Sequence, residues 1–256
     1  MKETQQLIDY VRLYDMQDPK IQLKLAHSLQ VGKLCEELAK RLGLEAEDIA
    51  LAKRIGLLHD IGRFPQVTRY HTFEDAKSEA HAQLGLKVLF EEGWIQKFHC
   101  DHTQEHLIRQ AICYHSDRTL PKTLDPRETM FCHIVRDCDK IDILRVHQQH
   151  PFTDYLNCTK EELSASLISD AVVDAFLQRT TVDFTKRKTP LDILLSHDAI
   201  LFGLHYPQSK EMFIERRYCL FTALQGISFL EKDTRRKLSI IMRSCKEEGF
   251  LVKEIL

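Results

Sequence analysis

Apolar residues recur every three or four positions along almost the whole chain, and this spacing limits the fold more than any other feature of the sequence. Leu34, Leu38 and Leu42, for example, follow one another at four-residue intervals. Glycine (9 residues) and proline (7 residues) are sparse, and alternating runs of β-branched residues are almost absent. The sequence therefore predicts an all-α fold, with weak strand candidates only at residues 182–185 and 251–255.

The length of 256 residues suits one large domain, or a core domain with an appended lobe. A compact chain of this size buries roughly 70–75% of its unfolded surface, so it needs no disulfide or metal ion merely to fold. The helical spacing continues after residue 150, but candidate ligands for a metal become fewer there. We therefore expect a core at residues 1–150 and a helical extension packed on it at residues 151–256.

Composition argues against several classes of protein. The 36 basic and 38 acidic residues give a net charge of −2, which does not fit a strongly basic nucleic-acid binder. No apolar run approaches the roughly 18 residues of a membrane span, and the first residues are charged where a signal peptide has an apolar core. The eight cysteines include no C-x-x-C pair, which predicts reduced thiols. We expect a cytoplasmic protein.

Histidine and aspartate carry the most informative pattern. His59 and Asp60 lie inside an apolar segment (GLLHDIGR, residues 56–63), and burying a charged aspartate is costly unless it is paired or bound to a metal ion. An ordinary helix end with a solvated aspartate is the alternative. Four further candidate ligands lie on separate predicted helices: His27, His81, His115 and Asp139. Each alone fits a packed or surface residue, but inward-facing ligands from five helices predict a metal site.

The order of these six residues resembles that of the HD superfamily of metal-dependent phosphohydrolases. His27 (in AHSLQVGKL) is similar to the leading histidine, His59-Asp60 (in HDIGRF) to the defining doublet, and Asp139 (in CDKID) to the closing aspartate. His81 (in SEAHAQLG) and His115 (in AICYHSD) resemble the two extra histidines of the two-metal members. The resemblance covers roughly residues 20–150. It implies that residues 1–150 form an HD-domain catalytic core.

The resemblance also implies a binuclear metal centre. The first divalent ion would be held by four residues: His27, His59, Asp60 and Asp139. His81 and His115 would hold the second, with Asp60 bridging. Nitrogen and oxygen ligands without thiolate suit Fe, Mn, Zn, Ni or Co. A hydroxide shared by two such ions would be the nucleophile in hydrolysis of a phosphomonoester or phosphodiester, expected to be nucleotide-like.

Cationic side chains near these motifs are the candidates for contact with the substrate phosphate. Arg63 follows the doublet and Lys140 follows Asp139, so both are assigned to catalysis together with Asp60. A salt bridge from Arg63 to Asp60 or Asp139 is the alternative role. The remaining substrate candidates lie in the polar segment 63–77 or after Asp139: Gln66, Arg69, Tyr70, Lys77 and Arg145.

Several alternatives remain open at this stage. His71 competes with His81 as a ligand, and the spacing of His99, His102 and His106 on one helix face fits either a further metal site or a solvated helix start. The same six ligands would also serve a di-iron oxygenase of this fold. A nucleotide-sensing module without turnover is a third interpretation. None of these needs a membrane or nucleic acid as partner, and a homo-oligomer is compatible with each.

Overall fold

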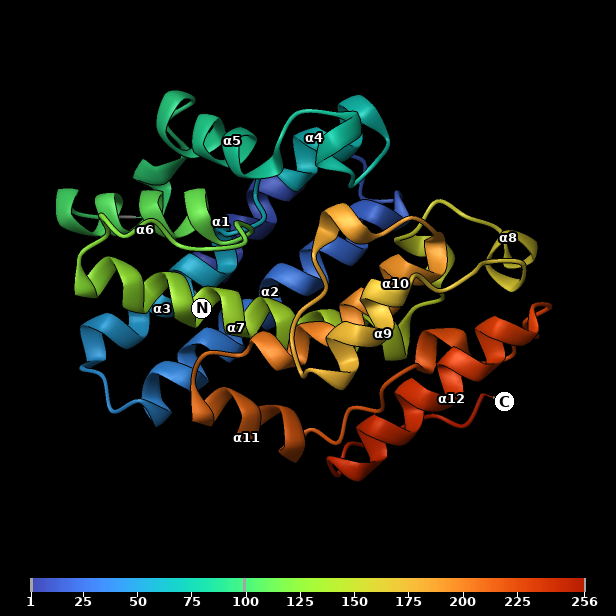
Figure 1. Cartoon of the computed structure of the whole chain (residues 1–256). Coiled ribbons are helices and arrows are strands. Elements are labelled where there is room, and N and C mark those ends of the chain that lie inside the picture. The colour runs from blue at the N-terminus through green and yellow to red at the C-terminus, as the bar shows by residue number, and fades with distance from the viewer. Residues whose placement is uncertain (1, 99, 256) are drawn as a thin grey trace. The chain divides into compact units, whose positions relative to one another are not determined.

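The computed structural model describes residues 2–98 and 100–255, and α-helices joined by short turns account for most of them (Figure 1). No strand ladder forms among the described residues, where Leu220 and Val252 make an isolated parallel bridge. The predicted all-α fold is therefore confirmed. None of the described helices is both long and apolar enough to cross a membrane. All eight cysteines are free thiols in this structure.

The chain divides into two compact units, residues 1–142 and 143–256. The helices that start in the first unit are α1 (Lys2–Val11), α2 (Pro19–Arg41), α3 (Ala46–Leu58), α4 (Arg63–Tyr70), α5 (His81–Leu86), α6 (His102–Tyr114) and α7 (Pro126–Gln149). Short turns of other helix types lie at Asp75–Lys77, Lys87–Glu91 and Trp94–Phe98. The unit boundary falls within α7. The assignment of a catalytic core and an appended lobe stays a prediction.

The pair α2 and α3 is the centre of the first unit, and the two helices lie side by side (Figure 1). Their close approach depends on glycine. A Cβ on Gly56 would lie 2.9 Å from the Cα of Gly32 and 2.8 Å from the sulfur of Cys35. Without side chains at Gly32 and Gly56, the end of α3 comes close to α2, and this brings the His59-Asp60 doublet towards the helix that carries His27.

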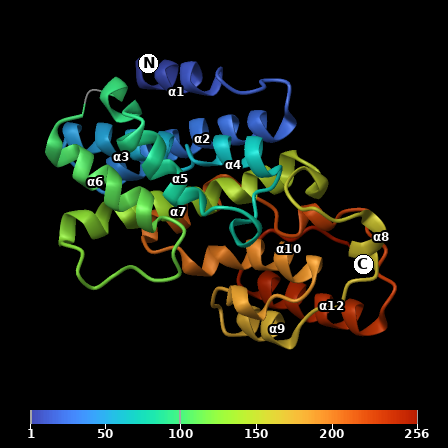
Figure 2. The ribbon, with the colours of Figure 1, turned by 90° about the horizontal axis from the view of Figure 1, so that it is seen from above.

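Helix α4 follows the doublet directly and packs against α2 and α5 (Figure 2). The polar segment that begins at Arg63 is thus helical at its start. Pro65 does not prevent this, since it lies in the first turn, where a helix tolerates proline. Phe64 and Val67 are buried. Gly62 lets this turn lie against α5: a Cβ there would be 2.1 Å from the carbonyl oxygen of His81.

The second unit contains α8 (Lys160–Ser164), α9 (Asp170–Leu177), α10 (Pro190–Ala199), α11 (Pro207–Glu215) and α12 (Lys232–Glu247). Helix α9 packs against α10 and α12. Thr159 and Glu162 form the capping box that their spacing predicts, and Thr189 caps α10 ahead of Pro190.

Two buried aspartates on α10 differ in how they are satisfied. Asp192 accepts three hydrogen bonds, from the backbone N–H and hydroxyl of Ser169 (2.8 and 2.6 Å) and from the N–H of Lys188 (2.8 Å). Asp198 accepts a 3.3 Å bond from the N–H of Phe221. Burial raises the pKa of Asp198 to about 7, and the Phe221 N–H offsets this only in part. The charged form of Asp198 is therefore unfavourable in the folded unit.

We expect Gly62→Ala to destabilise the protein by about 3 kcal/mol, because the added methyl meets backbone atoms of α5 that cannot move aside as a side chain can. Gly85→Ala is the matched control within α5: its Cβ would find its nearest neighbour at 3.4 Å, and alanine favours the helix. Urea unfolding of both variants measures the difference. Equal midpoints for the two variants would contradict this packing argument.

We expect Asp198→Asn to gain stability relative to the natural chain as pH rises. The folded pKa of Asp198 lies above the unfolded value, so the folded state binds the extra proton between about pH 4 and pH 7, and stability falls as pH rises through that window. Asparagine has no such proton. The unfolding free energy of Asp198→Asn minus that of the natural chain should be about 2 kcal/mol larger at pH 8 than at pH 5. A difference that does not vary with pH would refute the burial argument.

Candidate metal centre

The His59-Asp60 doublet follows the end of α3 and points into the interior of the first unit. Helix α3 ends at Leu58, and His59 and Asp60 lie in the tight turns before Gly62, the residue that precedes α4. Both side chains are buried, with 0% of His59 and 3% of Asp60 exposed. The alternative of a solvated aspartate at an ordinary helix end therefore does not hold for Asp60.

The first candidate ligand group joins three elements of the fold. His27 comes from α2, His59 from the end of α3 and Asp139 from α7. The Nε2 atom of His27 lies 3.0 Å from Oδ1 of Asp139, and Nε2 of His59 lies 3.7 Å from the same oxygen. One ligand atom from each residue thus lies within 4.8 Å of the others.

The second candidate group contains Asp60, His81 and His115. His81 is the first residue of α5 and His115 follows the last residue of α6. Their Nε2 atoms are 2.9 Å apart, and Oδ1 of Asp60 lies 3.5 Å from Nε2 of His81 and 3.8 Å from Nε2 of His115. All three side chains are buried.

Asp60 belongs to the second group and also faces the histidines of the first. Its Oδ1 faces His81 and His115, while its Oδ2 lies 3.6 Å from Nε2 of His27 and 3.6 Å from Nε2 of His59. Each oxygen of one carboxylate therefore points at one pair of imidazoles. This is the arrangement that a carboxylate needs in order to contact two cations at once.

Each of the four imidazoles is oriented through its Nδ1 atom. Nδ1 of His59 bonds the carbonyl of Gly56 and Nδ1 of His115 bonds the carbonyl of Ile112, both at 2.8 Å. A carbonyl only accepts, so in both residues Nδ1 carries a proton, and in the neutral ring Nε2 has the lone pair.

The other two histidines bond carboxylates. Nδ1 of His27 lies 2.7 Å from Oδ2 of Asp142, and Nδ1 of His81 lies 2.6 Å from Oδ2 of Asp75. All four Nε2 atoms therefore face Asp60 or Asp139, and each metal-ligating imidazole would have the kind of outer partner that fixes its orientation.

These donor atoms fit a divalent cation. Nε2 of His27 and Nε2 of His59 are buried, and neither makes a hydrogen bond of good geometry, although both face Oδ1 of Asp139. The lone pairs of His81 and His115 face each other at 2.9 Å, which is repulsive unless a positive centre lies between them. Nitrogen and carboxylate oxygen donors suit first-row transition metals. The residues present thus match the group that the sequence pattern implies.

The charge states support the same conclusion. Burial favours the protonated form of Asp60, but Lys24 and His59 hold the pKa of its carboxyl well below the usual value. The pKa of Asp139 is also well below its usual value, because His27 and His59 outweigh burial. Burial and Arg63 lower the pKa of His81 to about 4, so this imidazole is neutral near pH 7. Ionised carboxylates and a neutral imidazole are the forms that bind metal ions.

His27 is different, because two carboxylates flank it. Burial and Lys24 lower its pKa, but Asp139 and Asp142 outweigh them and raise the pKa to about 9. A cation bound at Nε2 of His27 would therefore replace a proton.

Lys24 is a site residue that the sequence analysis did not identify. Its Nζ lies 2.6 Å from Oδ2 of Asp60, and its side chain is 17% exposed. It precedes His27 by three residues, one helical turn, so the spacing along α2 offered a signal. Asp75 was also missed, since no periodicity links it to His81 across the turn at Asp75–Lys77.

Arg63 makes contacts other than the predicted contact with substrate. Its guanidinium donates to the carbonyl of Phe73 (2.6 Å) and to Oδ1 of Asp75 (2.9 Å), and its Nε lies 3.4 Å from Oδ1 of Asp60. Gln66, with 0% exposure, donates to the same Asp75 oxygen at 2.8 Å. Both residues hold the segment after α4, and Arg63 also reaches Asp60, which agrees with the alternative role considered for Arg63.

The other substrate candidates lie in varied surroundings. Arg69 and Tyr70 are exposed at the end of α4, and Lys77 is exposed and paired with Glu74 at 2.9 Å. Nζ of Lys140 lies 3.9 Å from Oδ1 of Asp137. Arg145 belongs to the second unit, where it donates to Gln149. Substrate roles for these residues stay predictions.

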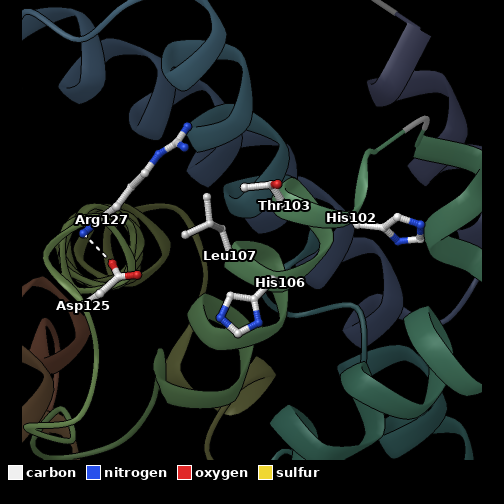
Figure 3. Close-up of a pocket in the computed structure, with 6 residues that line it drawn as sticks. All are labelled: His102, Thr103, His106, Leu107, Asp125 and Arg127. Atoms are coloured by element: carbon white, nitrogen blue, oxygen red, sulfur yellow. Dashed lines mark hydrogen bonds between the residues drawn. The ribbon is translucent and has the colours of Figure 1, made fainter.

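The alternative histidines lie outside both ligand groups. His71 is exposed at the end of α4, whereas His81 is in the second group. His99 lies outside the described residues. His102 and His106 line a pocket of about 410 Å³ with Thr103, Leu107, Asp125 and Arg127 (Figure 3). His102 is fully exposed and His106 pairs with Glu128 at 2.6 Å, so the described part of this face holds no ligand group.

Comparison with known proteins agrees with this geometry. The HD domain family matches residues 25–145, a range that contains both ligand groups. Ribonuclease Y of Enterococcus faecalis is 46% identical over 63 residues, which are 25% of this chain and 11% of that protein. Ribonuclease Y of Protochlamydia amoebophila is 28% identical over 165 residues, 64% of this chain and 30% of that protein.

The chain spans less than a third of the length of these curated relatives, and no solved structure gives a significant match. The family match covers every residue of the two groups, from His27 to Asp139. The match identifies residues 25–145 of this chain as an HD domain.

Proposed function

We propose that this protein hydrolyses a phosphoester bond of a small, nucleotide-like substrate with the help of two divalent transition-metal ions. The observation that carries the proposal is the position of Asp60, whose two carboxylate oxygens face separate pairs of histidines at 3.5–3.8 Å. The HD domain at residues 25–145 supports phosphoester hydrolysis as the class of reaction.

Two bound ions at such a centre would polarise a phosphoryl oxygen and lower the pKa of a coordinated water. The chain itself supplies orientation. Six side chains would hold the ions: His27, His59, Asp60, His81, His115 and Asp139. Because hydrogen bonds at Nδ1 already fix all four imidazoles, little rearrangement is needed on binding.

Lys24 is the cation best placed to contact the substrate phosphate. It lies against Asp60 at the partly exposed edge of the centre, and its Nζ is 5.3 Å from the centre of the Phe73 ring. A cation next to an aromatic face suits a ligand that joins a phosphate to a flat base. These two side chains support the nucleotide-like class of substrate.

Two other activities remain to be separated by experiment. The relatives are named ribonucleases, and cleavage of RNA is also phosphodiester hydrolysis, so an RNA oligonucleotide belongs in the substrate panel beside nucleotides. A di-iron oxygenase would use the same six ligands, but would require iron and consume dioxygen. Hydrolysis with manganese or zinc under anaerobic conditions would distinguish the proposed function from an oxygenase.

We expect the protein equilibrated with excess Mn²⁺ to bind about two ions per chain, and the double variant His81→Ala, His115→Ala to bind about one. Elemental analysis by mass spectrometry measures this number. His102→Ala is the control, since its fully exposed ring lies outside both groups and its loss should leave the metal content unchanged. A natural chain that binds no metal would exclude the proposed function.

We expect Lys24→Ala to lower kcat/KM by about 10–100-fold on the substrate that a panel of nucleotides and generic phosphoesters identifies, because it removes a charge-assisted contact. Most of the loss should appear as a higher KM. Lys33→Ala on the same helix is the control, because Lys33 is exposed. Unchanged kinetics for Lys24→Ala would remove this residue from the substrate site.

A further inference from the structure

The two ligand groups are alike in one respect. In each group, Nδ1 of one histidine bonds a carboxylate and Nδ1 of the other histidine bonds a backbone carbonyl. His27 has Asp142 at 2.7 Å and His81 has Asp75 at 2.6 Å, whereas His59 and His115 have backbone carbonyls. A carboxylate at Nδ1 makes an imidazole a stronger metal ligand than a carbonyl does. The strength of each group therefore depends on the state of its carboxylate.

The two carboxylates lie in different surroundings. Asp142 is completely buried, so water does not screen its interaction with His27. The side chain of Asp75 is 37% exposed. The guanidinium of Arg63 also lies 2.9 Å from Asp75, and Gln66 donates to it at 2.8 Å. The negative charge of Asp75 is thus divided between His81 and Arg63, and it is partly screened by solvent.

The supporting elements differ as well. Asp142 lies on α7, one turn after Asp139, so one helix of 24 residues positions both a ligand and the carboxylate behind its partner histidine. Asp75 begins a three-residue turn, Asp75–Lys77, that contains no buried residue. Such a segment opens locally more readily than the interior of a long packed helix.

We propose that Asp142 and Asp75 are positioning residues that make the two metal sites unequal, so that the His27 group holds its ion tightly and the His81 group holds an exchangeable ion. This rests on the proposed two-metal function. The exchangeable site is coupled to the turn at Asp75–Lys77 through Arg63. This side chain donates to the carbonyl of Phe73 and to Asp75, and its Nε lies 3.4 Å from Oδ1 of Asp60. A change in that turn would therefore alter occupancy of the second site without disturbing the first.

The test is titration of the metal-free protein with Mn²⁺, followed by calorimetry and by equilibrium dialysis with elemental analysis. The natural chain should show a tight and a weak class of site. Asp75→Asn should weaken the weak class about 10–100-fold and leave the tight class unchanged, and Asp142→Asn should weaken the tight class by a similar factor. Asp75→Glu, which keeps the charge at a half-exposed position, should restore part of the weak-class affinity.

His81→Ala identifies the classes independently, because it should abolish the weak class alone even if Asp142→Asn fails to fold. Circular dichroism of each variant checks folding without metal. Two sites of equal affinity in the natural chain would overturn the inference while leaving the proposed function intact. So would an Asp75→Asn variant that weakens the tight class, or weakens neither. A natural chain that binds no Mn²⁺, Zn²⁺ or Fe²⁺ would overturn both.

Discussion

The buried charge of Asp60 is the constraint on which the rest of the first unit depends. A carboxylate with 3% exposure must be compensated, and the fold surrounds it with four imidazoles and the ammonium group of Lys24. Each imidazole has its own support, a carbonyl or a carboxylate at Nδ1. The polar network is thus built outward from one side chain, and its free lone pairs point inward to where a cation would lie.

Three glycines allow the helices that carry the candidate ligands to approach one another closely. Gly32 and Gly56 allow α2 and α3 to approach closely, which brings His27 towards the doublet. Gly62 allows the turn after the doublet to touch the start of α5, which brings His81 towards Asp60. Four of the candidate ligands lie at or beside helix ends: His59, Asp60, His81 and His115. His27 and Asp139 lie within the long helices α2 and α7.

Periodicity predicted the all-α fold because a three-to-four residue stripe records the buried face of each helix. The candidate ligands were proposed from their order along the chain, and the structure brings them together in two groups; their role as ligands stays a prediction. The roles of Arg63 and Gln66 were not predictable in the same way. Both are polar residues just after the His59-Asp60 doublet. Arg63 donates to Phe73 and Gln66 donates to Asp75, further along the chain, and no periodicity in the sequence predicts the path of the segment between them. Asp75 was missed for the same reason.

In the proposed centre, Asp60 lies between two cations, each held by one pair of histidines. Crystals of the protein grown with Mn²⁺ test it most directly, through anomalous diffraction. We expect two anomalous peaks, one beside His27, His59 and Asp139 and the other beside His81 and His115, with one oxygen of Asp60 against each. A single peak, or peaks away from Asp60, would contradict it.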